Sequence, residues 1–413
     1  MTHGHANLKI KDSGIEWVGA IPQHWRVLPF FSFVDEVTNS NQGLKERNLL
    51  SLSYGRIVRK DIERLEGLTP ASFEGYNIVE HNDIIFRLTD LQNDQTSLRS
   101  ARSDERGIIT SAYVTVRPHQ SPRFFEYLMR SYDTTKVFYG IGGGIRQSMN
   151  FANVKRLPVV VPPFEEMEAI ATYLDRATTR IDALIAKKIR FIELLREKRQ
   201  ALIAHAVTKG LDAEMPMKDS GVEWLGTIPT NWTTKRLRFV CDVTTGGKDT
   251  VDATSDGAYP FYVRSQEVQR INTYSAECEA VLTAGDGAGV GKVYHYVNGK
   301  FDFHQRVYMM YNFRNVRGRY FFHYLRSLFS AVALDGGAKS TVDSLRMPVF
   351  RNFSITVPSL SEQDEIVQFI EERSSRIDAL IAKTERSIKL LREHRTALIT
   401  AAVTGKIDLR KAA

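Results

Sequence analysis

The chain has 413 residues, with 56 Lys and Arg against 48 Asp and Glu, and its formal net charge is +8 at pH 7. This length predicts two or more domains, and the moderately basic balance permits an anionic partner without requiring one. No apolar run is long enough to cross a membrane, no secretory signal is visible, and the two cysteines lack a paired spacing, so we expect a cytoplasmic protein without structural zinc.

The first element is a box at residues 11–25, KDSGIEWVGAIPQHW. It returns at residues 218–232 as KDSGVEWLGTIPTNW, with 10 of 15 positions identical. We expect each box to pack against a helix end and to perform no chemistry. Four tryptophans are expected to be its buried anchors: Trp17, Trp25, Trp224 and Trp232.

A variable segment follows each box, at residues 26–161 and 233–357. Apolar or alternating runs predict strands at 77–88, 108–117, 292–297 and 306–313. Both segments then show a short amphipathic helix containing FF-x-YL, at 123–132 and 319–329, a Gly-rich turn, and a strand that ends at proline. The segments therefore share a predicted mixed α/β fold and differ on their surfaces, as two related but different binding sites would.

A long helix is predicted after each segment. Residues 164–209 and 359–404 each form a run of 46 residues without Gly or Pro, with Pro before and Gly after. Within them, residues 177–208 and 373–404 are identical at 21 of 32 positions. We predict that the two copies pair antiparallel; the alternative is two surface helices on two duplicated domains.

The apolar residues of both copies recur at steps of four and three, which is close to the a/d seam of a coiled coil. The predicted seam passes through Leu184, Phe191 and Leu380. Where polar residues interrupt this seam, the apolar stripe shifts to neighbouring positions, because 3.6 residues per helical turn do not fit a seven-residue repeat evenly. The shifted positions are Ile185, Ile192, Ile203, Ile381, Ile388 and Ile399.

The predicted fold class is therefore α+β, with an internal pseudo-twofold repeat. Two mixed α/β domains, at residues 1–161 and 211–357, are separated by an antiparallel coiled coil of long helices at 162–210 and 358–413.

Two strings resemble catalytic motifs and fail. Residues 283–292, TAGDGAGVGK, lack both the spacing and the Ser/Thr of a phosphate-binding loop. Residues 161–164, VPPF, lack the Asn or Asp of the similar adenine-methyltransferase box. No nuclease-like carboxylate–lysine cluster and no Cys/His nucleophile stands out. We therefore predict no catalytic and no metal-binding residue.

The whole chain resembles the specificity subunits of type I restriction-modification enzymes. The resemblance is carried by RIDALIAKK…IELLREKRQALIAHAVTKGLD and its repeat, by the helix openings PPFEEMEAIATYLD and PSLSEQDEIVQFIE, and by the two boxes. The stretch FYVRSQEV and the glycine-rich residues after it also resemble a recurring target-recognition domain.

The resemblance implies a non-catalytic subunit. Each variable segment would be a target-recognition domain that reads one half of a bipartite double-stranded DNA site, and the paired helices would set the spacing. Modification subunits, expected to be two, would dock on the helices and methylate adenine with S-adenosylmethionine. Restriction subunits would add the endonuclease that uses ATP and Mg²⁺. Because the two segments differ, we expect an asymmetric site.

Candidate DNA contacts are polar side chains in loops of the two segments. Arg favours guanine, Asn and Gln favour adenine, and Lys or Arg neutralise phosphates. The candidates of the first segment are Arg56, Arg59, Lys60, Arg87, Gln92, Asn93, Gln95, Arg99, Arg146 and Gln147. Those of the second are Lys248, Arg264, Gln266, His304, Gln305, Arg306, Lys339 and Ser340.

For each candidate the alternative is a solvated surface side chain, and Arg306 has the further alternative of pairing with a buried carboxylate such as Asp302. Two other functions stay open for the chain as a whole. One is a coiled-coil assembly scaffold with protein-binding end domains, and the other is a stand-alone nuclease or methyltransferase.

Overall fold

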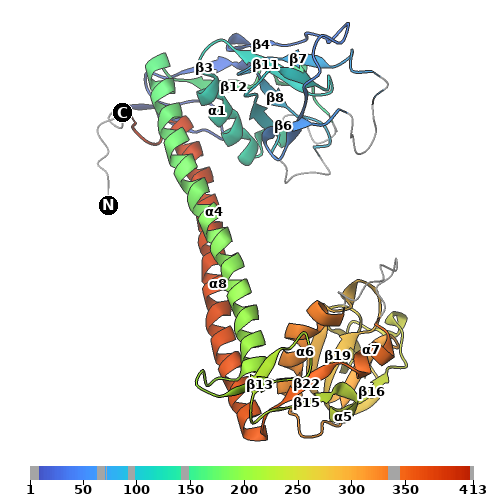
Figure 1. Cartoon of the computed structure of the whole chain (residues 1–413). Coiled ribbons are helices and arrows are strands. Elements are labelled where there is room, and N and C mark those ends of the chain that lie inside the picture. Colours follow the sequence, from blue (N-terminus) through green and yellow to red (C-terminus); the bar gives the residue numbers. More distant parts are fainter. Residues whose placement is uncertain are drawn as a thin grey trace. The chain divides into compact units, whose positions relative to one another are not determined.

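The chain divides into two compact units in the computed structural model (Figure 1), which describes residues 9–62, 70, 72–91, 98–140, 148–333 and 345–409. Unit 1 contains residues 1–188 and 386–413, and unit 2 contains residues 189–385. Each unit therefore holds one box, one variable segment and part of both long helices. The sequence instead predicted the long helices, at residues 162–210 and 358–413, to be parts separate from the two domains.

The two long helices are confirmed. Helix α4 spans Phe164–Lys209 and α8 spans Leu360–Val403. In each unit the two helices lie side by side, with the start of one beside the end of the other (Figure 1). An ion pair joins them in both units: Arg395 Nε lies 3.0 Å from Asp182 Oδ1 in unit 1, and Arg199 pairs with Asp378 in unit 2. The antiparallel pairing is thus confirmed within each unit.

The buried stripe of these helices is only partly the predicted one. Ile192 and Ile388 are each 6 % exposed, whereas Leu184 and Leu380 are 43 % and 46 % exposed. Phe191 is also exposed. Of the shifted positions, Ile192, Ile381, Ile388 and Ile399 are buried and Ile185 and Ile203 are half-buried, because an undistorted helix drifts away from a strict seven-residue repeat. The placement of Leu184, Leu380 and Phe191 in the seam was wrong.

Each box forms a hairpin that is anchored to the start of a long helix. The strands are β1 (Ile10–Asp12), β2 (Ala20–Pro22), β13 (Met217–Asp219) and β14 (Thr227–Pro229). Trp25 is buried and donates its Nε1–H to Glu166 Oε2 of α4 at 2.8 Å; Trp232 does the same to Glu362 Oε1 of α8, also at 2.8 Å. The helix dipole favours a carboxylate in this first turn. Packing of the boxes against helix ends is confirmed.

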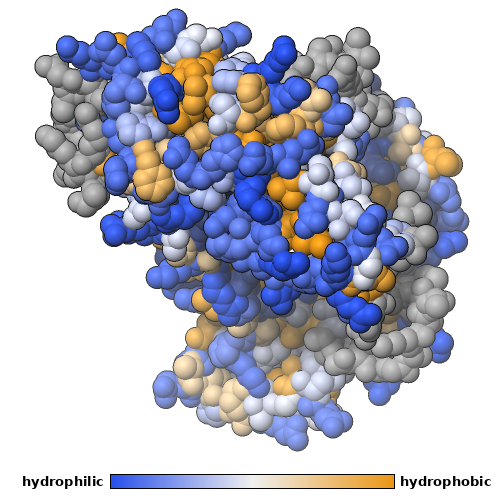
Figure 2. Space-filling model, turned by 90° about the horizontal axis from the view of Figure 1, so that it is seen from above, coloured by the Kyte–Doolittle hydropathy of each residue, from blue (hydrophilic) through white to orange (hydrophobic). Residues whose placement is uncertain are grey.

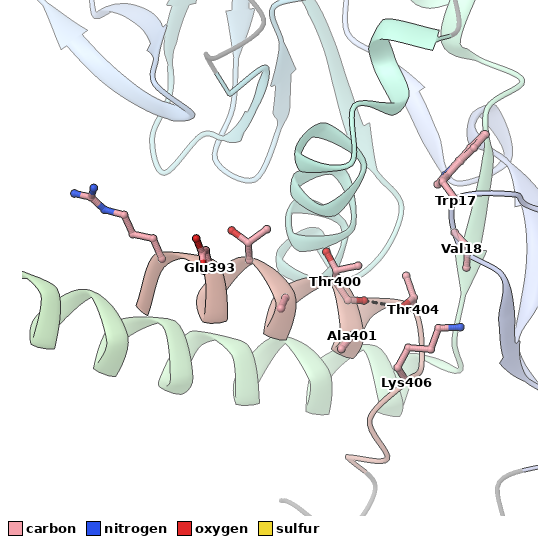
Figure 3. Close-up of a pocket in the computed structure, with 10 residues that line it drawn as sticks. Trp17, Val18, Glu393, Thr400, Ala401, Thr404 and Lys406 are labelled. Atoms are coloured by element: carbon pink, nitrogen blue, oxygen red, sulfur yellow. Dashed lines mark hydrogen bonds between the residues drawn. The ribbon is translucent and has the colours of Figure 1, made fainter. Parts of the chain in front are cut away.

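The first tryptophan of each box is not a buried anchor. Trp17 and Trp224 are each 37 % exposed, and they contact the edge of Tyr132 and the face of Phe353, respectively. In unit 1, Trp17 faces the last turns of α8 across a groove of 690 Å³ (Figure 3). The prediction of burial was therefore wrong for Trp17 and Trp224.

A four-stranded antiparallel sheet of the same order is common to both variable segments, which confirms that they share a fold. The order is β4-β11-β8-β9 in unit 1 and β16-β21-β19-β20 in unit 2. In unit 1 these strands are Val34–Glu36, Val114–Pro118, Ile84–Phe86 and Ser100–Arg102. In unit 2 they are Asp242–Thr245, Val307–Tyr311, Ala276–Ala284 and Tyr294–Phe303.

The two sheets are extended in different ways. Unit 1 adds a second sheet of order β6-β5-β10-β7, whose strands are Arg56–Lys60, Leu49–Ser53, Gly107–Ile109 and Asn77–Val79. In unit 2, β17 (Tyr259–Tyr262) pairs in parallel with β20, and β18 (Gln269–Ile271) pairs with β17. The units therefore diverge in the part of the fold that lies outside the shared sheet.

Each segment ends as predicted, with an amphipathic helix and a closing strand. The helices are α1 (Pro122–Thr134) and α6 (Gly318–Ala333). The closing strands β12 (Pro158–Val161) and β22 (Ser354–Val357) pair with β3 (Arg26–Pro29) and β15 (Thr233–Arg236). Shorter helices are η1 (Phe30–Ser32), α2 (Val137–Gly140), α3 (Phe151–Val154), α5 (Leu237–Val240), η2 (Thr250–Asp252), η3 (Gly287–Gly289) and α7 (Met347–Arg351). The Gly-rich turns predicted after α1 and α6 lie outside the described residues.

The largest apolar core of each unit includes the ends of the long helices. In unit 1 the buried face of α1 packs with Ile170 of α4 and Ile399 of α8; in unit 2 the buried face of α6 packs with Val207 of α4 and Ile366 of α8. Hydrophilic residues cover most of the face shown in Figure 2, and hydrophobic residues form small patches among them. Burial in a common core explains why the helix ends stay attached to the segments.

A mostly buried histidine should make the stability of unit 2 depend on pH. Burial lowers the pKa of His323 in α6 from 6.5 to about 4. The unfolded chain therefore takes up this proton near pH 6.5 and the folded chain does not, so stability is fully present above pH 6.5 and is lost as the pH falls toward 4. The expected loss is about 3 kcal/mol. Urea unfolding at several pH values should show that His323→Gln removes this slope; an unchanged slope in the variant would contradict the assignment.

Candidate nucleic-acid interface

Three strand ends meet at one edge of the six-stranded sheet in unit 2. Strand β19 runs antiparallel to β21, with Ala284 opposite Val307, so the residues after β19 lie beside the β20–β21 turn. Strand β17 runs parallel to β20, with Tyr262 opposite Phe303, so the residues after β17 reach the same turn. Candidates that are far apart in the sequence are therefore brought together here.

Asp286 joins two of these candidates. Its Oδ1 lies 2.9 Å from Arg264 Nη1, and its Oδ2 lies 2.7 Å from Arg306 Nη1. Burial alone would raise the pKa of Asp286, but the hydrogen bonds and positive charges of both arginines outweigh it and the pKa is lowered. The carboxylate is therefore ionised at neutral pH and holds two guanidinium groups on either side of it. We call these three residues the Arg264–Asp286–Arg306 cluster.

Both arginines of the cluster keep surface for a ligand. The Arg306 side chain is 59 % exposed and that of Arg264 is 39 % exposed. A guanidinium carries five N–H donors, and the hydrogen bond to Asp286 uses one of them. The cluster therefore presents a net positive charge and several oriented donors to solvent.

The turn beside this cluster is held by a buried histidine. The Nδ1 of His304 accepts a hydrogen bond of 2.9 Å from the backbone N–H of Arg306, and the side chain is buried. Burial lowers the pKa of His304, which agrees with a neutral ring that accepts at Nδ1. His304 therefore shapes the turn and does not offer its ring to DNA, so its prediction as a contact was wrong.

Gln305 remains exposed at the tip of the turn. Its Nε2 donates a 2.7 Å hydrogen bond to Asp249 Oδ2, and its backbone N–H donates to the carbonyl oxygen of Lys248 at 2.9 Å. Gln266 is exposed in the loop after β17. Lys248, Gln266 and Gln305 thus lie on loops around the same edge of the sheet.

The suggested pairing of Arg306 with Asp302 was wrong. Asp302 is buried, and its carboxylate accepts hydrogen bonds from the hydroxyls of Thr273 and Ser275 at 2.8 and 2.7 Å. Arg306 pairs with Asp286 instead because the β20–β21 turn carries it past the buried part of the strand.

The glycines of the string TAGDGAGVGK allow backbones to approach closely around Asp286. The N–H of Gly285 donates to the Arg306 carbonyl oxygen at 2.8 Å, and a Cβ there would lie 3.0 Å from that oxygen. A Cβ on Gly289 would lie 2.6 Å from the carbonyl oxygen of Arg264. The glycine run is thus explained by packing against both arginine-bearing segments.

The candidates of unit 1 are less concentrated. Arg56, Arg59 and Lys60 lie on the edge strand β6 and are exposed. Arg59 Nε donates to Glu105 Oε1 at 2.8 Å, whereas Arg56 and Lys60 point to the other face of the strand. Arg87 is half-buried just after β8.

Arg99 has a structural role. Its side chain is fully buried and donates to the carbonyl oxygen of Thr89 at 3.0 Å and to the Tyr139 hydroxyl at 3.2 Å. A buried guanidinium is retained when its donors are satisfied inside the protein. The prediction of Arg99 as a DNA contact was therefore wrong. Seven further candidates lie outside the described residues: Gln92, Asn93, Gln95, Arg146, Gln147, Lys339 and Ser340.

Two residues of the interface were missed. Asp249 and Asp286 are acidic, and acidic side chains are not expected to contact DNA phosphates; here they hold Gln305 and the two arginines in place. The only sequence signal was the position of Asp286 within a glycine-rich string close to a predicted strand. Across the described ranges, no group of three or more His, Cys, Asp or Glu is placed to hold a metal ion, and no helix there is long and apolar enough to cross a membrane.

The part of the chain that contains the cluster is similar to known sequences. Residues 229–390 match the family described as type I restriction modification DNA specificity domain. The chain is 29 % identical over 182 residues to the type I restriction enzyme EcoDI specificity subunit of Escherichia coli. These aligned residues make up 44 % of this chain and 40 % of that protein. It is 22 % identical over 229 residues to a putative type I restriction enzyme MjaX specificity subunit of Methanocaldococcus jannaschii, 52 % of each protein. The aligned part thus spans about half the length of these relatives or less.

Solved structures share the fold over nearly the whole chain. A chain from a study of complex assembly and conformational transition in a type I R-M system covers 94 % of this chain and 99 % of its own length, with a TM-score of 0.72 and 16 % identity. The match to the HsdS subunit from Thermoanaerobacter tengcongensis covers 94 % of this chain and 98 % of that subunit, with a TM-score of 0.53 and 15 % identity. Residues 229–390 are therefore similar to the type I restriction modification DNA specificity domain, and the chain as a whole shares the fold of these solved structures.

Proposed function

We propose that this chain is the non-catalytic DNA-specificity subunit of a type I restriction-modification enzyme. The observation that carries the proposal is the location of the Arg264–Asp286–Arg306 cluster inside the matched DNA specificity domain, residues 229–390. Exposed guanidinium groups fixed on loops at a sheet edge suit hydrogen bonding to base edges. Lysine side chains on the surrounding loops suit contacts with phosphates.

Each unit would read one half of a bipartite double-stranded site. In unit 2, Arg264 and Arg306 are suited to guanine, and Gln305 is suited to adenine. Unit 1 presents Arg56, Arg59 and Lys60 on an edge strand, a different set of groups in a different arrangement. Since the two units offer different side chains, the two halves of the site should differ in sequence.

The chemistry of the enzyme would belong to partners. Two modification subunits would bind along α4 and α8 and methylate adenine with S-adenosylmethionine. Restriction subunits would supply the endonuclease and use ATP and Mg²⁺. The assembly would work in the cytoplasm, where its DNA is found. The repeat supports two modification subunits, because each unit offers the start of one long helix beside the end of the other.

Exchange of one variable segment should change one half of the methylated site. We would replace residues 233–357 with the corresponding segment of a homologue whose methylated site is known, leaving both boxes and both long helices intact. Mapping of methylated adenines across the genome of cells that carry the hybrid should show a new sequence in one half and the parental sequence in the other. A change in both halves, with the hybrid still active, would contradict modular reading.

Binding to duplex DNA separates this function from an assembly scaffold. The full chain, together with its modification subunits, should bind duplexes with an affinity that falls as salt rises, because phosphate contacts release counterions. A scaffold would bind no DNA under these conditions. The partner subunits alone serve as the control, because any binding that they show must be subtracted.

A further inference from the structure

Unit 1 contains a basic pocket where its edge hairpin meets the long helices. The pocket has a volume of 400 Å³ and is lined by the β5–β6 hairpin, α1, α4 and α8. Four arginines line it, Arg56, Arg130, Arg392 and Arg395, together with the carboxylates Glu126 and Asp182. Three separate parts of the chain therefore contribute positive charge to one cavity.

The two carboxylates already have partners. Asp182 pairs with Arg395, whose Nε lies 3.0 Å from Asp182 Oδ1. Glu126 accepts a hydrogen bond of 3.0 Å from the Nε of Arg102, which lies outside the pocket lining. With four arginines and two carboxylates, the lining of the pocket keeps a net positive charge.

Arg130 is held in place at the base of this pocket. Its Nη2 donates a 2.7 Å hydrogen bond to the carbonyl oxygen of Gly55, at the tip of the hairpin. Burial lowers the pKa of Arg130, the negative charges of Glu126 and Asp133 raise it, and the positive charges of Arg395 and Arg56 lower it by smaller amounts. The guanidinium groups of Arg130, Arg395 and Arg56 are thus near enough to act on one another electrostatically, and an anion bound among them would be favoured.

Arg56 and Arg392 can bind such an anion, because their guanidinium groups are exposed. Within the described part of the chain, neither side chain forms an ion pair, and both are exposed. Arg392 comes from the last third of α8 and Arg56 from the first strand residue after the hairpin turn. A guanidinium fork from each of two elements is a suitable arrangement for a phosphate group.

Comparison of the two repeats shows that only the arginine of unit 1 lacks an acidic partner among the described residues. The residue that corresponds to Arg392 at the offset of 196 is Arg196, which in unit 2 pairs with Glu385 at 3.5 Å. The residue that corresponds to Glu385 at the same offset is Ile189, which has no charge to offer. The same arginine is therefore neutralised in one copy and left without an acidic partner in the other.

We propose that the pocket lined by Arg56, Arg130 and Arg392 binds a backbone phosphodiester of the DNA that unit 1 reads. This inference rests on the proposed function, and it adds a contact that fixes the position of the DNA without reading sequence. The bound phosphate would contact both the β5–β6 hairpin, through Arg56, and α8, through Arg392. A phosphate bound here places the backbone at a defined position relative to the candidate side chains of β6.

The test uses the full chain with its modification subunits and a duplex that carries the mapped methylation site. We expect Arg392→Gln to lower affinity by about tenfold at low salt. The slope of log K against log salt should become shallower by about 0.9, which is the value for one lost phosphate contact. Arg196→Gln is the matched control, because it removes the same charge from the equivalent helix position, and its salt slope should stay that of the wild type.

Duplexes with single methylphosphonate linkages distinguish a DNA phosphate from free phosphate. One neutral linkage should weaken binding by the wild type and have no further effect on Arg392→Gln. If the wild type binds its duplex and Arg392→Gln has the same slope and the same methylphosphonate profile, the phosphate site is wrong. If the wild type binds no duplex, the proposed function itself fails. Thermal unfolding of the variant, matched to the wild type, excludes loss of fold as the cause.

Discussion

Replacement of Trp232 with alanine is expected to destabilise unit 2 by about 3–5 kcal/mol, the usual cost of truncating a buried aromatic residue. Trp232 is completely buried, and its Nε1–H donates to Glu362 Oε1 at 2.8 Å. The substitution leaves a cavity and takes the N–H donor away from a carboxylate in the first turn of α8. The ring of Trp232 also packs closely against Gly210, just after α4, because a Cβ at Gly210 would lie only 3.3 Å from it.

Urea unfolding followed by circular dichroism measures this loss, and hydrogen exchange locates it in unit 2. Trp224→Ala is the control, because Trp224 belongs to the same box, is 37 % exposed and stacks on Phe353 without an Nε1 hydrogen bond to any described residue. Its cost should be about 1 kcal/mol, the value of a surface aromatic pair. Equal losses in the two variants would show that the box is not anchored through Trp232.

The elements that the sequence predicted well are those that local rules determine. The two runs of 46 residues without Gly or Pro predicted α4 and α8 almost residue for residue. Their pairing followed from the repeat, because each copy supplies an Asp and an Arg to reciprocal ion pairs. The boxes and the closing strands also followed from patterns within about 15 residues.

The features that the sequence did not predict depend on how distant strands are placed in register. Trp17 and Trp25 belong to the same box, but only Trp25 lies in the apolar core and donates a hydrogen bond to Glu166 of α4. Arg87 and Arg99 are backbone hydrogen-bond partners, and the buried guanidinium of Arg99 donates to the carbonyl oxygens of Thr89 and Asp90. Asp286 meets Arg264 and Arg306 only because β17, β19 and β20 end at the same edge of the sheet.

Asp286→Asn is expected to strengthen non-specific DNA binding and to weaken sequence discrimination. The substitution removes one negative charge from the Arg264–Asp286–Arg306 cluster, so attraction to phosphates should increase and the salt slope should become steeper. An asparagine offers one acceptor oxygen in place of two, and its NH₂ group faces a guanidinium that also donates. At least one arginine therefore loses its fixed position, and the discrimination given by a good bidentate contact, about 1–3 kcal/mol, should be lost.

Arg306→Ala should act differently from Asp286→Asn. It removes a donor as well as a charge, so affinity for the specific site should fall by about 1–3 kcal/mol, which is roughly 5- to 150-fold. Discrimination should relax at one position of the half-site read by unit 2 and remain unchanged in the other half. Binding competitions between the mapped duplex and duplexes altered at single positions measure both effects.

Asp256→Asn separates positioning from charge. Asp256 is exposed on a loop of unit 2 and forms no ion pair with a described residue, so its substitution changes the net charge by the same amount as Asp286→Asn. Non-specific binding should rise slightly in both variants, because both gain one unit of positive charge. Discrimination should fall only in Asp286→Asn, because only that carboxylate holds two guanidinium groups in place. Equal discrimination in the two variants would mean that the cluster contributes charge alone, and that base reading by unit 2 depends on other side chains.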